Sequence, residues 1–288
     1  MKVLFYGSKG WIGGMVVKRW AELYPEDEII CSETRICPEN LEKIKVEILN
    51  ADRVFSTIGR TSGTLKDGSF IPNIDYLETN LNENMRDNLY GPIMIAKICE
   101  KYNKHYSYIG TGCIFSRDTN NNDYEYTEKD LPDFFGSSYS IVKGYTDNLM
   151  RLFTNVANFR IRMPIVDEEH PKNFITKIVN FKKICSFQNS MTYLPDLIPV
   201  MIRISREKMA GTFNMVNKGG ISHSEILEMY KEIINPEHTY ELIKIEDLDD
   251  ILKAKRSNNI LTTDKLESIT DIRDLKECIK EAIHNMKK

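Results

Sequence analysis

The 288-residue sequence contains no apolar run that approaches the ~20 residues of a membrane-spanning helix, so we expect no transmembrane segment. Its first residues indicate a strand rather than a signal peptide. Six cysteines are scattered without a C-x-x-C pair, and five histidines show no ligand spacing, which argues against a metal site or a disulfide framework. The formal net charge is -3, so nothing indicates nucleic-acid or anionic-membrane binding. We therefore expect a reduced, cytoplasmic protein.

Short apolar runs alternate with helical patterns through the first half of the chain. The runs predict strands at Lys2–Tyr6, Glu28–Ser32, Asp52–Ile58, Tyr106–Ile109, Asn158–Pro164 and Gly211–Val216. The helical patterns between them predict helices at Met15–Leu23, at Tyr76–Tyr102 with a break near Gly91, and over a segment that ends near Phe153. This alternation predicts an α/β fold with a Rossmann-like doubly wound parallel sheet.

The last third of the chain changes character. A short helix or loop is expected at Asn173–Ile178, and charged helices from Thr263 onwards. Ser222 and Glu225 have the spacing of a capping box that opens a helix. Between residues 116 and 130 we expect a polar, mobile loop. We place a dinucleotide-binding domain at residues 1–165, with a strand returning to it near 211–217, and a smaller, mainly substrate-binding domain at 166–288.

A glycine-rich turn joins the first strand to the first helix. Its sequence is Gly7-Ser8-Lys9-Gly10-Trp11-Ile12-Gly13, a G-x-x-G-x-x-G spacing. One glycine permits the tight turn, the next lets backbone N–H groups approach a pyrophosphate, and the third lets the helix pack closely on the strand. Strand, glycine-rich turn and helix together predict a dinucleotide site, although a ligand-free turn would also fit the glycines.

Residues at the ends of the second and third strands face the same predicted crevice. After the second strand an acidic Glu33 would favour NAD, whereas Ser32 and Arg35, with Lys9, favour the 2′-phosphate of NADP(H). We expect NADPH, although Arg35 could also be a solvated surface charge. The third strand ends in Ile58-Gly59-Arg60, and Arg60 could meet a phosphate, a sugar or only solvent.

Tyr139 stands four residues before Lys143, which places both on one face of a helix. A nearby ammonium favours the phenolate and should lower the pKa of the tyrosine. Such a pair supplies the proton that carbonyl reduction by hydride requires. The pattern also arises by chance in unrelated helices.

With Thr111 after the fourth strand, these elements make the chain resemble the extended short-chain dehydrogenase/reductase superfamily. The resemblance is greater to one of its families, bifunctional 3,5-epimerase/4-reductases that form UDP-L-rhamnose from UDP-4-keto-6-deoxyglucose with NADPH. The segments that resemble this family are Gly110–Phe115, Arg162–Pro164, Asn173–Ile178, Asn189–Thr192, Ser222–Tyr230 and Arg256–Asn259. Residues 63–72 and 116–130 look divergent. Virus-encoded members exist, in which case the host cytosol is expected.

The resemblance implies a role for each matched residue. Thr111, Tyr139 and Lys143 would carry the reduction, and Cys113 with Lys177 would form the epimerase acid–base pair. Without the resemblance, Cys113 would be a buried strand-end cysteine and Lys177 an exposed lysine. Asn80, Met163 and Pro164 would complete the cofactor site. The substrate ligands would be Arg60, Cys113, Asn173 and Arg256, with Lys183 as a weaker candidate for the diphosphate. A homodimer is also implied.

Three other functions fit parts of the pattern. A 4,6-dehydratase usually has an acid–base pair next to its threonine, where this chain has Gly112 and Cys113. A monofunctional 4-reductase of UDP- or dTDP-4-keto-rhamnose would lack proton exchange. A non-catalytic NADP-binding regulatory subunit could have the same fold, but Thr111, Tyr139 and Lys143 are all present.

Overall fold

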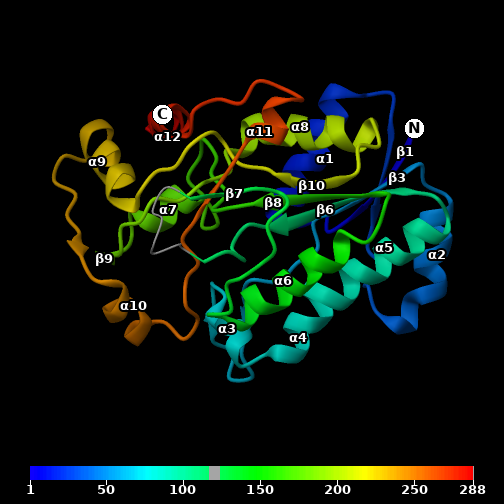
Figure 1. Ribbon diagram of the computed structural model, residues 1–288, viewed down its shortest axis with the longest axis horizontal. Coiled ribbons are helices and arrows are strands. Elements are labelled where there is room, and N and C mark those ends of the chain that lie inside the picture. Colours follow the sequence, from blue (N-terminus) through cyan, green and yellow to red (C-terminus); the bar gives the residue numbers. More distant parts are fainter. Residues whose placement is uncertain (117–123, 288) are drawn as a thin grey trace.

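The computed structural model describes residues 1–116 and 124–287 of the chain. Its centre is a six-stranded parallel sheet in the order β10-β8-β6-β3-β1-β2 (Figure 1). The strands are β1 (Lys2–Tyr6), β2 (Glu28–Ser32), β3 (Arg53–Ser56), β6 (His105–Thr111), β8 (Val156–Ile161) and β10 (Gly211–Asn214). The predicted fold class is confirmed. Because β1 lies between β2 and β3, the strand order reverses there, and ligands bind beyond the carboxyl ends of strands at such a point.

Helices cover both faces of the sheet (Figure 1). One layer contains α1 (Trp11–Leu23) and α8 (Leu194–Arg206), and the other contains α2 (Leu41–Leu49), α5 (Gly91–Lys101) and α6 (Ser138–Met150). Along β1, Phe5 enters the core of the first layer and Leu4 that of the second. The strand is buried on both faces, which explains why its sequence is almost wholly apolar.

The helix predicted for Tyr76–Tyr102 is the main error in the expected elements. The chain forms α3 (Asp75–Glu78), α4 (Leu81–Met85), a π-helical turn at Arg86–Tyr90 and then α5. The break therefore lies at Thr79 and Asn80, not near Gly91. Pro92 causes no break, because it occupies the first turn of α5, where its missing N–H would have had no partner. The predicted strand at Asn158–Pro164 also begins earlier and ends before Arg162.

The C-terminal third builds a separate apolar core. Around it lie α7 (Phe174–Ile178), α9 (His223–Ile233) and α12 (Leu275–Met286), together with the pair β9 (Lys183–Ile184) and β11 (Glu241–Leu242). The capping box predicted at Ser222 and Glu225 is present at the start of α9. A short helix, α10 (Ile245–Ile251), lies beside this region (Figure 1).

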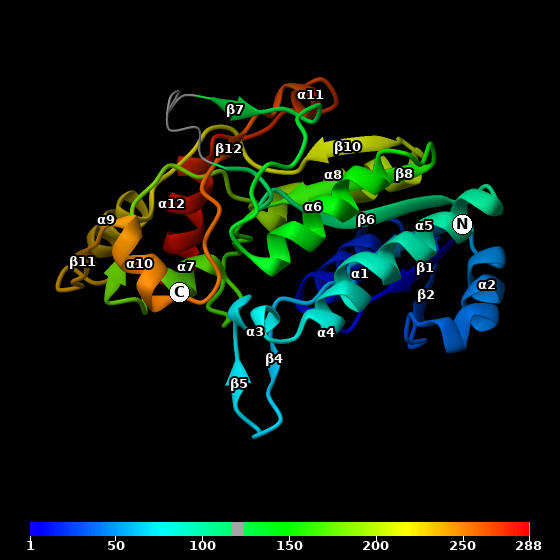
Figure 2. The same cartoon turned by 60° about the horizontal axis from the view of Figure 1, so that its bottom comes forward.

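Three small elements lie outside the central sheet and the C-terminal core. The strand pair β7 (Glu125–Tyr126) and β12 (Ile260–Leu261) ties the loop after β6 to the C-terminal segment, just before α11 (Asp264–Glu267). The hairpin of β4 (Gly63–Thr64) and β5 (Phe70–Ile71) projects from the body of the protein (Figure 2). A 3-10 turn spans Pro38–Asn40. Of the loop predicted at 116–130, residues 117–123 lie outside the described residues. No helix in the described chain is both long and apolar enough to span a bilayer.

Candidate active site

The turn after β6 is fixed to the start of α6. The backbone N–H of Cys113 donates to Thr111 Oγ1 at 3.1 Å, and Ser140 Oγ donates to the Cys113 carbonyl at 2.7 Å. Ser137 caps α6 by accepting from the N–H of Ser140 at 3.1 Å. Since α6 carries Tyr139 in its first turn, these bonds hold the Thr111 and Cys113 side chains beside the tyrosine.

Tyr139 is half-buried and keeps its proton. Burial raises the pKa of Tyr139, negative charge at Cys113 would raise it further, and a hydrogen bond from Thr111 opposes this. The expected lowering of the tyrosine pKa by Lys143 does not occur here, because the lysine ammonium points elsewhere. Tyr139 is therefore a hydrogen-bond donor that can give up its proton to an oxygen that develops negative charge.

The Lys143 ammonium contacts β6 instead. It donates to Tyr108 Oη and, at 3.4 Å, to the Ile109 carbonyl, and lies 4.5 Å from the centre of the Tyr108 ring. Lys143 is 4% exposed, and burial lowers its pKa from 10.5 to about 7 despite the opposing charges of Asp147 and Cys113. A lysine so close to half-protonation can gain or lose a proton near neutral pH.

The glycine-rich turn has no space for side chains at two positions. Gly7 adopts a φ of +86°, which favours glycine, and a Cβ on Gly13 would lie 2.1 Å from the Gly7 carbonyl oxygen. The N-cap Gly10 offers no side chain to the first N–H groups of α1. The N–H groups of Trp11, Ile12 and Gly13 therefore remain available for an anion, as a pyrophosphate site requires.

The residues expected near the adenosine ribose have partners within the fold. Ser32 Oγ donates to Glu47 at 2.9 Å, so this hydroxyl is already engaged in the fold, and Lys9 pairs with Glu33 at 2.5 Å on the surface. Arg35 belongs to a cluster of guanidinium groups around the Asp87 carboxylate, which lies 3.8 Å from Arg35, 2.6 Å from Arg60 and 2.7 Å from Arg86, a residue not predicted from the sequence.

Asp87 is charged within this cluster. Burial would raise its pKa, but hydrogen bonds from Arg86 and Arg60 outweigh burial and lower the pKa below its usual value. Arg60 also lies 3.3 Å from Glu83. Three positive charges thus face two negative ones, and the cluster can accept a further anion.

The loop of Ile58 and Gly59 at the end of β3 is held by buried asparagines. Asn88 accepts from the N–H of Arg60 at 2.8 Å and donates to its carbonyl at 2.9 Å, and Asn84 accepts from Asn88 at 2.8 Å. These asparagines and Asp87 were missed by sequence reasoning. Their spacing of three and four residues on a helical pattern was a usable signal.

Met163 and Asn80 lie at bends of the chain. Met163 has a φ of +36° although Pro164 follows it, a conformation that costs roughly 1–3 kcal/mol and is typical of functional sites. Asn80 precedes α4 and donates to the Tyr76 carbonyl at 2.8 Å. Contact of Met163, Pro164 or Asn80 with a cofactor stays a prediction.

Lys177 lies half-buried on α7, and burial, assisted by the charge of Lys172, lowers its pKa. Asn173 caps this helix by accepting from the Ile175 N–H at 3.2 Å, and its amide donates to the Val166 and Glu168 carbonyls at 3.0 and 2.8 Å. All of its polar atoms are thus used within the fold. A substrate contact for Asn173 stays a prediction.

The two basic residues expected near a diphosphate differ in setting. Arg256 donates to Asp75 of α3 at 3.0 Å and to its own loop at the Ala254 carbonyl. Lys183 lies on the surface beside Glu241 at 3.6 Å. The structure thus places Arg256 against α3 and Lys183 on the β9–β11 strand pair.

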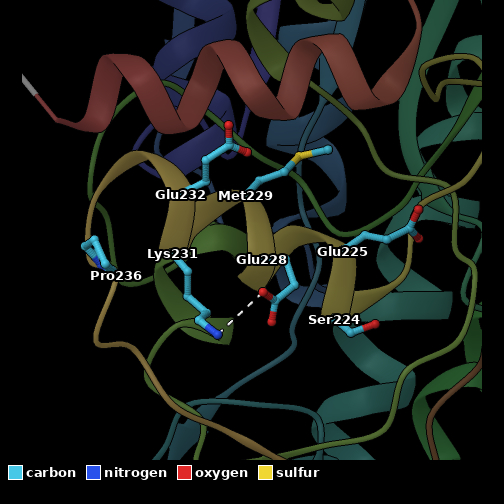
Figure 3. A pocket seen from close by; sticks show the side chains of 7 residues that line it. All are labelled: Ser224, Glu225, Glu228, Met229, Lys231, Glu232 and Pro236. Atoms are coloured by element: carbon cyan, nitrogen blue, oxygen red, sulfur yellow. Dashed lines mark ion pairs between the residues drawn. The ribbon is translucent and has the colours of Figure 1, made fainter.

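An open hollow lies on α9 (Figure 3). Glu225, Glu228, Lys231 and Glu232 contribute to its lining, and Lys231 pairs with Glu228 at 3.5 Å. Its walls carry no group that the chemistry above needs. Among the described residues no cluster of three or more histidine, cysteine or acidic side chains could hold a metal ion.

Known proteins resemble the chain over its whole length. The L780 protein of Acanthamoeba polyphaga mimivirus is 47% identical over 100% of this chain and 99% of its own, and the crystal structure of this L780 UDP-rhamnose synthase superposes with a TM-score of 0.92 over 99% of both chains. A bifunctional dTDP-4-dehydrorhamnose 3,5-epimerase/dTDP-4-dehydrorhamnose reductase of Arabidopsis thaliana is 33% identical over 96% of this chain and 90% of its own. The chain belongs to this family of nucleotide-sugar epimerase/reductases.

In one plant relative, the part that resembles this chain belongs to a longer protein. A trifunctional UDP-glucose 4,6-dehydratase/UDP-4-keto-6-deoxy-D-glucose 3,5-epimerase/UDP-4-keto-L-rhamnose-reductase of Arabidopsis thaliana is 34% identical over 93% of this chain, which spans 39% of that protein. No protein-family model matches the chain. Family membership confirms the resemblance read from the sequence and makes the chain an enzyme of nucleotide-sugar metabolism.

Proposed function

We propose that the protein epimerises C3 and C5 of UDP-4-keto-6-deoxy-D-glucose and then reduces its C4 ketone with NADPH, giving UDP-L-rhamnose. The observation that carries this proposal is the cluster of Thr111, Cys113 and Tyr139 beside Lys143, where β6 meets α6. One cluster offers both hydrogen-bond donors for the C4 oxygen and a thiol next to them.

Epimerisation depends on the acidity of protons next to the C4 ketone. One group removes a proton from C3 or C5, and a second group returns a proton to the opposite face. Cys113 and Lys177 are the proposed pair, and burial lowers the pKa of Lys177, which makes its ammonium a better proton donor. Tyr139 and Thr111 donate hydrogen bonds to the oxygen of the enolate formed between these steps.

Reduction uses the same oxygen. Bound NADPH supplies the hydride to C4. Tyr139 passes its proton to the C4 oxygen, and Lys143 would hold the ribose hydroxyls of the cofactor. The glycine turn fits this cofactor, because the N–H groups at the start of α1 have no side-chain cap and the N-cap Gly10 places no side chain beside them.

The arginine cluster supports a preference for NADPH over NADH. Arg35 and Arg60 lie after β2 and β3, at the crevice where the adenosine ribose belongs in this fold. With Arg86 they make three guanidinium groups that face two carboxylates, Asp87 and Glu83, so a 2′-phosphate would supply the missing negative charge.

We further propose a homodimer formed through α4 and α6. Leu81 and Met85 of α4 and Tyr145 and Leu149 of α6 are large apolar side chains that are 38–59% exposed on two helices in contact. Pairing this face with a second copy would remove it from water. Sedimentation should show a dimer that Leu149→Lys weakens, and a monomer at all concentrations would contradict the proposal.

A two-stage NMR assay tests the proposed reaction. In deuterated water without cofactor, the protein should introduce deuterium at C3 and C5 of UDP-4-keto-6-deoxyglucose, and UDP-rhamnose should form once NADPH is added. Tyr139→Phe should slow the formation of UDP-rhamnose far more than the deuterium exchange, since the substitution removes the proton donor for reduction. Absence of exchange, with NADPH consumed only on pre-epimerised substrate, would leave a monofunctional reductase.

A further inference from the structure

Arg162 follows β8 and is buried directly beneath the Cys113 turn. Its side chain is 1% exposed, and Nη1 donates to the Gly112 carbonyl at 2.8 Å. Nη2 donates to Asn189 Oδ1 at 2.5 Å, and longer bonds reach Ser190 and Ser257. All of these acceptors are uncharged.

The charge of Arg162 has no carboxylate partner among the described side chains. Arg160, two residues earlier and also buried, is paired in the usual way with a carboxylate. Its Nε and Nη2 donate to Asp147 at 2.9 and 2.7 Å. A buried cation without such a partner is costly and needs another reason to be present. Burial lowers the pKa of Arg162, and the opposing effect comes from negative charge on the Cys113 thiol.

The turn that carries Cys113 rests on the arginine side chain. A Cβ on Gly112 would lie 2.9 Å from Arg162 Cγ, so the backbone and the arginine stem are in direct contact. Asn259 also donates to the Gly112 carbonyl, at 3.1 Å. Arg162 is thus tied to the residue before Cys113 by both packing and hydrogen bonding.

We propose that Arg162 is a positioning residue for the epimerase step, which orients the Cys113 sulfur and supplies the positive charge that a thiolate there requires. This inference rests on the proposed function. In the step, the C–H bond next to the ketone breaks, its proton forms an S–H bond, and the electron pair moves into the enolate. Lys177 then returns a proton to the opposite face and becomes a neutral amine. Both groups are reset by proton exchange with water.

Two variants separate charge from shape. Arg162→Gln removes the charge, and Arg162→Lys keeps the charge but loses the planar fork that spans Gly112 and Asn189. Ile48→Ala, a fully buried change on α2 in another core, controls for loss of stability alone. Each variant is assayed for deuterium exchange without cofactor and, separately, for NADPH oxidation with pre-epimerised substrate.

Arg162→Gln should slow exchange on the order of 100-fold, the usual range for a lost acid–base contribution, while reduction stays within about threefold. Arg162→Lys should retain more exchange than Arg162→Gln. With Cys31 and Cys37 replaced by serine, iodoacetamide should alkylate Cys113 roughly tenfold more slowly in Arg162→Gln at pH 7.5, since the thiolate is the nucleophile.

Equal losses of exchange and reduction, as expected for Ile48→Ala, would overturn the inference, and so would unchanged exchange. If Arg162→Gln does not fold, Arg162→Lys is the test: its rate of exchange must fall more than its rate of NADPH oxidation. Absence of exchange in the natural protein would refute the proposed function itself, an outcome that the variants cannot imitate.

Discussion

Replacing Lys143 with methionine should stabilise the protein, although it removes an active-site group. The side chain is 4% exposed, and its pKa falls from 10.5 to about 7 on folding. A shift of one pKa unit corresponds to 1.36 kcal/mol, so burial of the charged Lys143 ammonium lowers the stability of the folded state by on the order of 5 kcal/mol. Methionine matches the length of the lysine stem and brings no charge.

The pH dependence gives this prediction its sign. Because the pKa of Lys143 is lowered in the folded state, the unfolded chain binds more protons between pH 7 and 10.5, and stability rises with pH through that window. The loss of stability caused by the buried Lys143 charge is complete below pH 7 and absent above pH 10.5. Lys143→Met should therefore gain about 5 kcal/mol over the natural protein at pH 6 but only about 1 kcal/mol at pH 10.

Urea unfolding without cofactor, followed by tryptophan fluorescence from pH 6 to 10, measures this difference. Lys97→Met provides the control, since Lys97 is exposed on α5 and should change stability by less than about 0.5 kcal/mol at every pH. A Lys143→Met difference that stays constant across this range, or one that grows with pH, would refute the reasoning.

Three further substitutions test the packing that supports the site. Gly13→Ala should abolish NADPH binding in a fluorescence titration, because its Cβ would lie 2.1 Å from a carbonyl oxygen, whereas Gly14→Ala, with its nearest neighbour at 3.6 Å, should bind normally. Asp147→Asn leaves the buried Arg160 guanidinium without a charged partner and should lower the free energy of unfolding by about 3–5 kcal/mol; a loss below 1 kcal/mol in urea would contradict this. Ser222→Ala removes the cap of α9 and should cost about 1 kcal/mol by the same measurement, and no loss would show that the cap is dispensable.

Local patterns in the sequence were enough to predict the parallel sheet, the glycine turn and the cap at Ser222. Each of these depends on residues a few positions apart, so composition and spacing specify them. The break at Asn80 was mispredicted because Gly91 and Pro92 look like a helix stop, while the π-helical turn before them has no simple sequence signature.

The electrostatics of the site could not be predicted in the same way. The spacing of Tyr139 and Lys143 gave a shared helix face, but burial and a contact with Tyr108 on β6 determine where the ammonium points. Arg162 looked like part of a strand, and only the fold shows that it lies under Gly112 without a carboxylate. Such properties arise from residues brought together over long stretches of chain.

The anchoring of the Cys113 turn has a consequence for how the protein folds. Asn259 donates to the carbonyls of Gly112 and Phe115, and Ser257 also donates to Phe115, so these bonds join residues more than 140 positions apart. The central sheet, by contrast, is complete at Asn214. During synthesis, the central sheet can therefore form before the Cys113 turn gains these anchors. Contacts between residues so far apart in the chain form late and slowly, so the segment from Ser257 onwards is the part of the chain that completes the site.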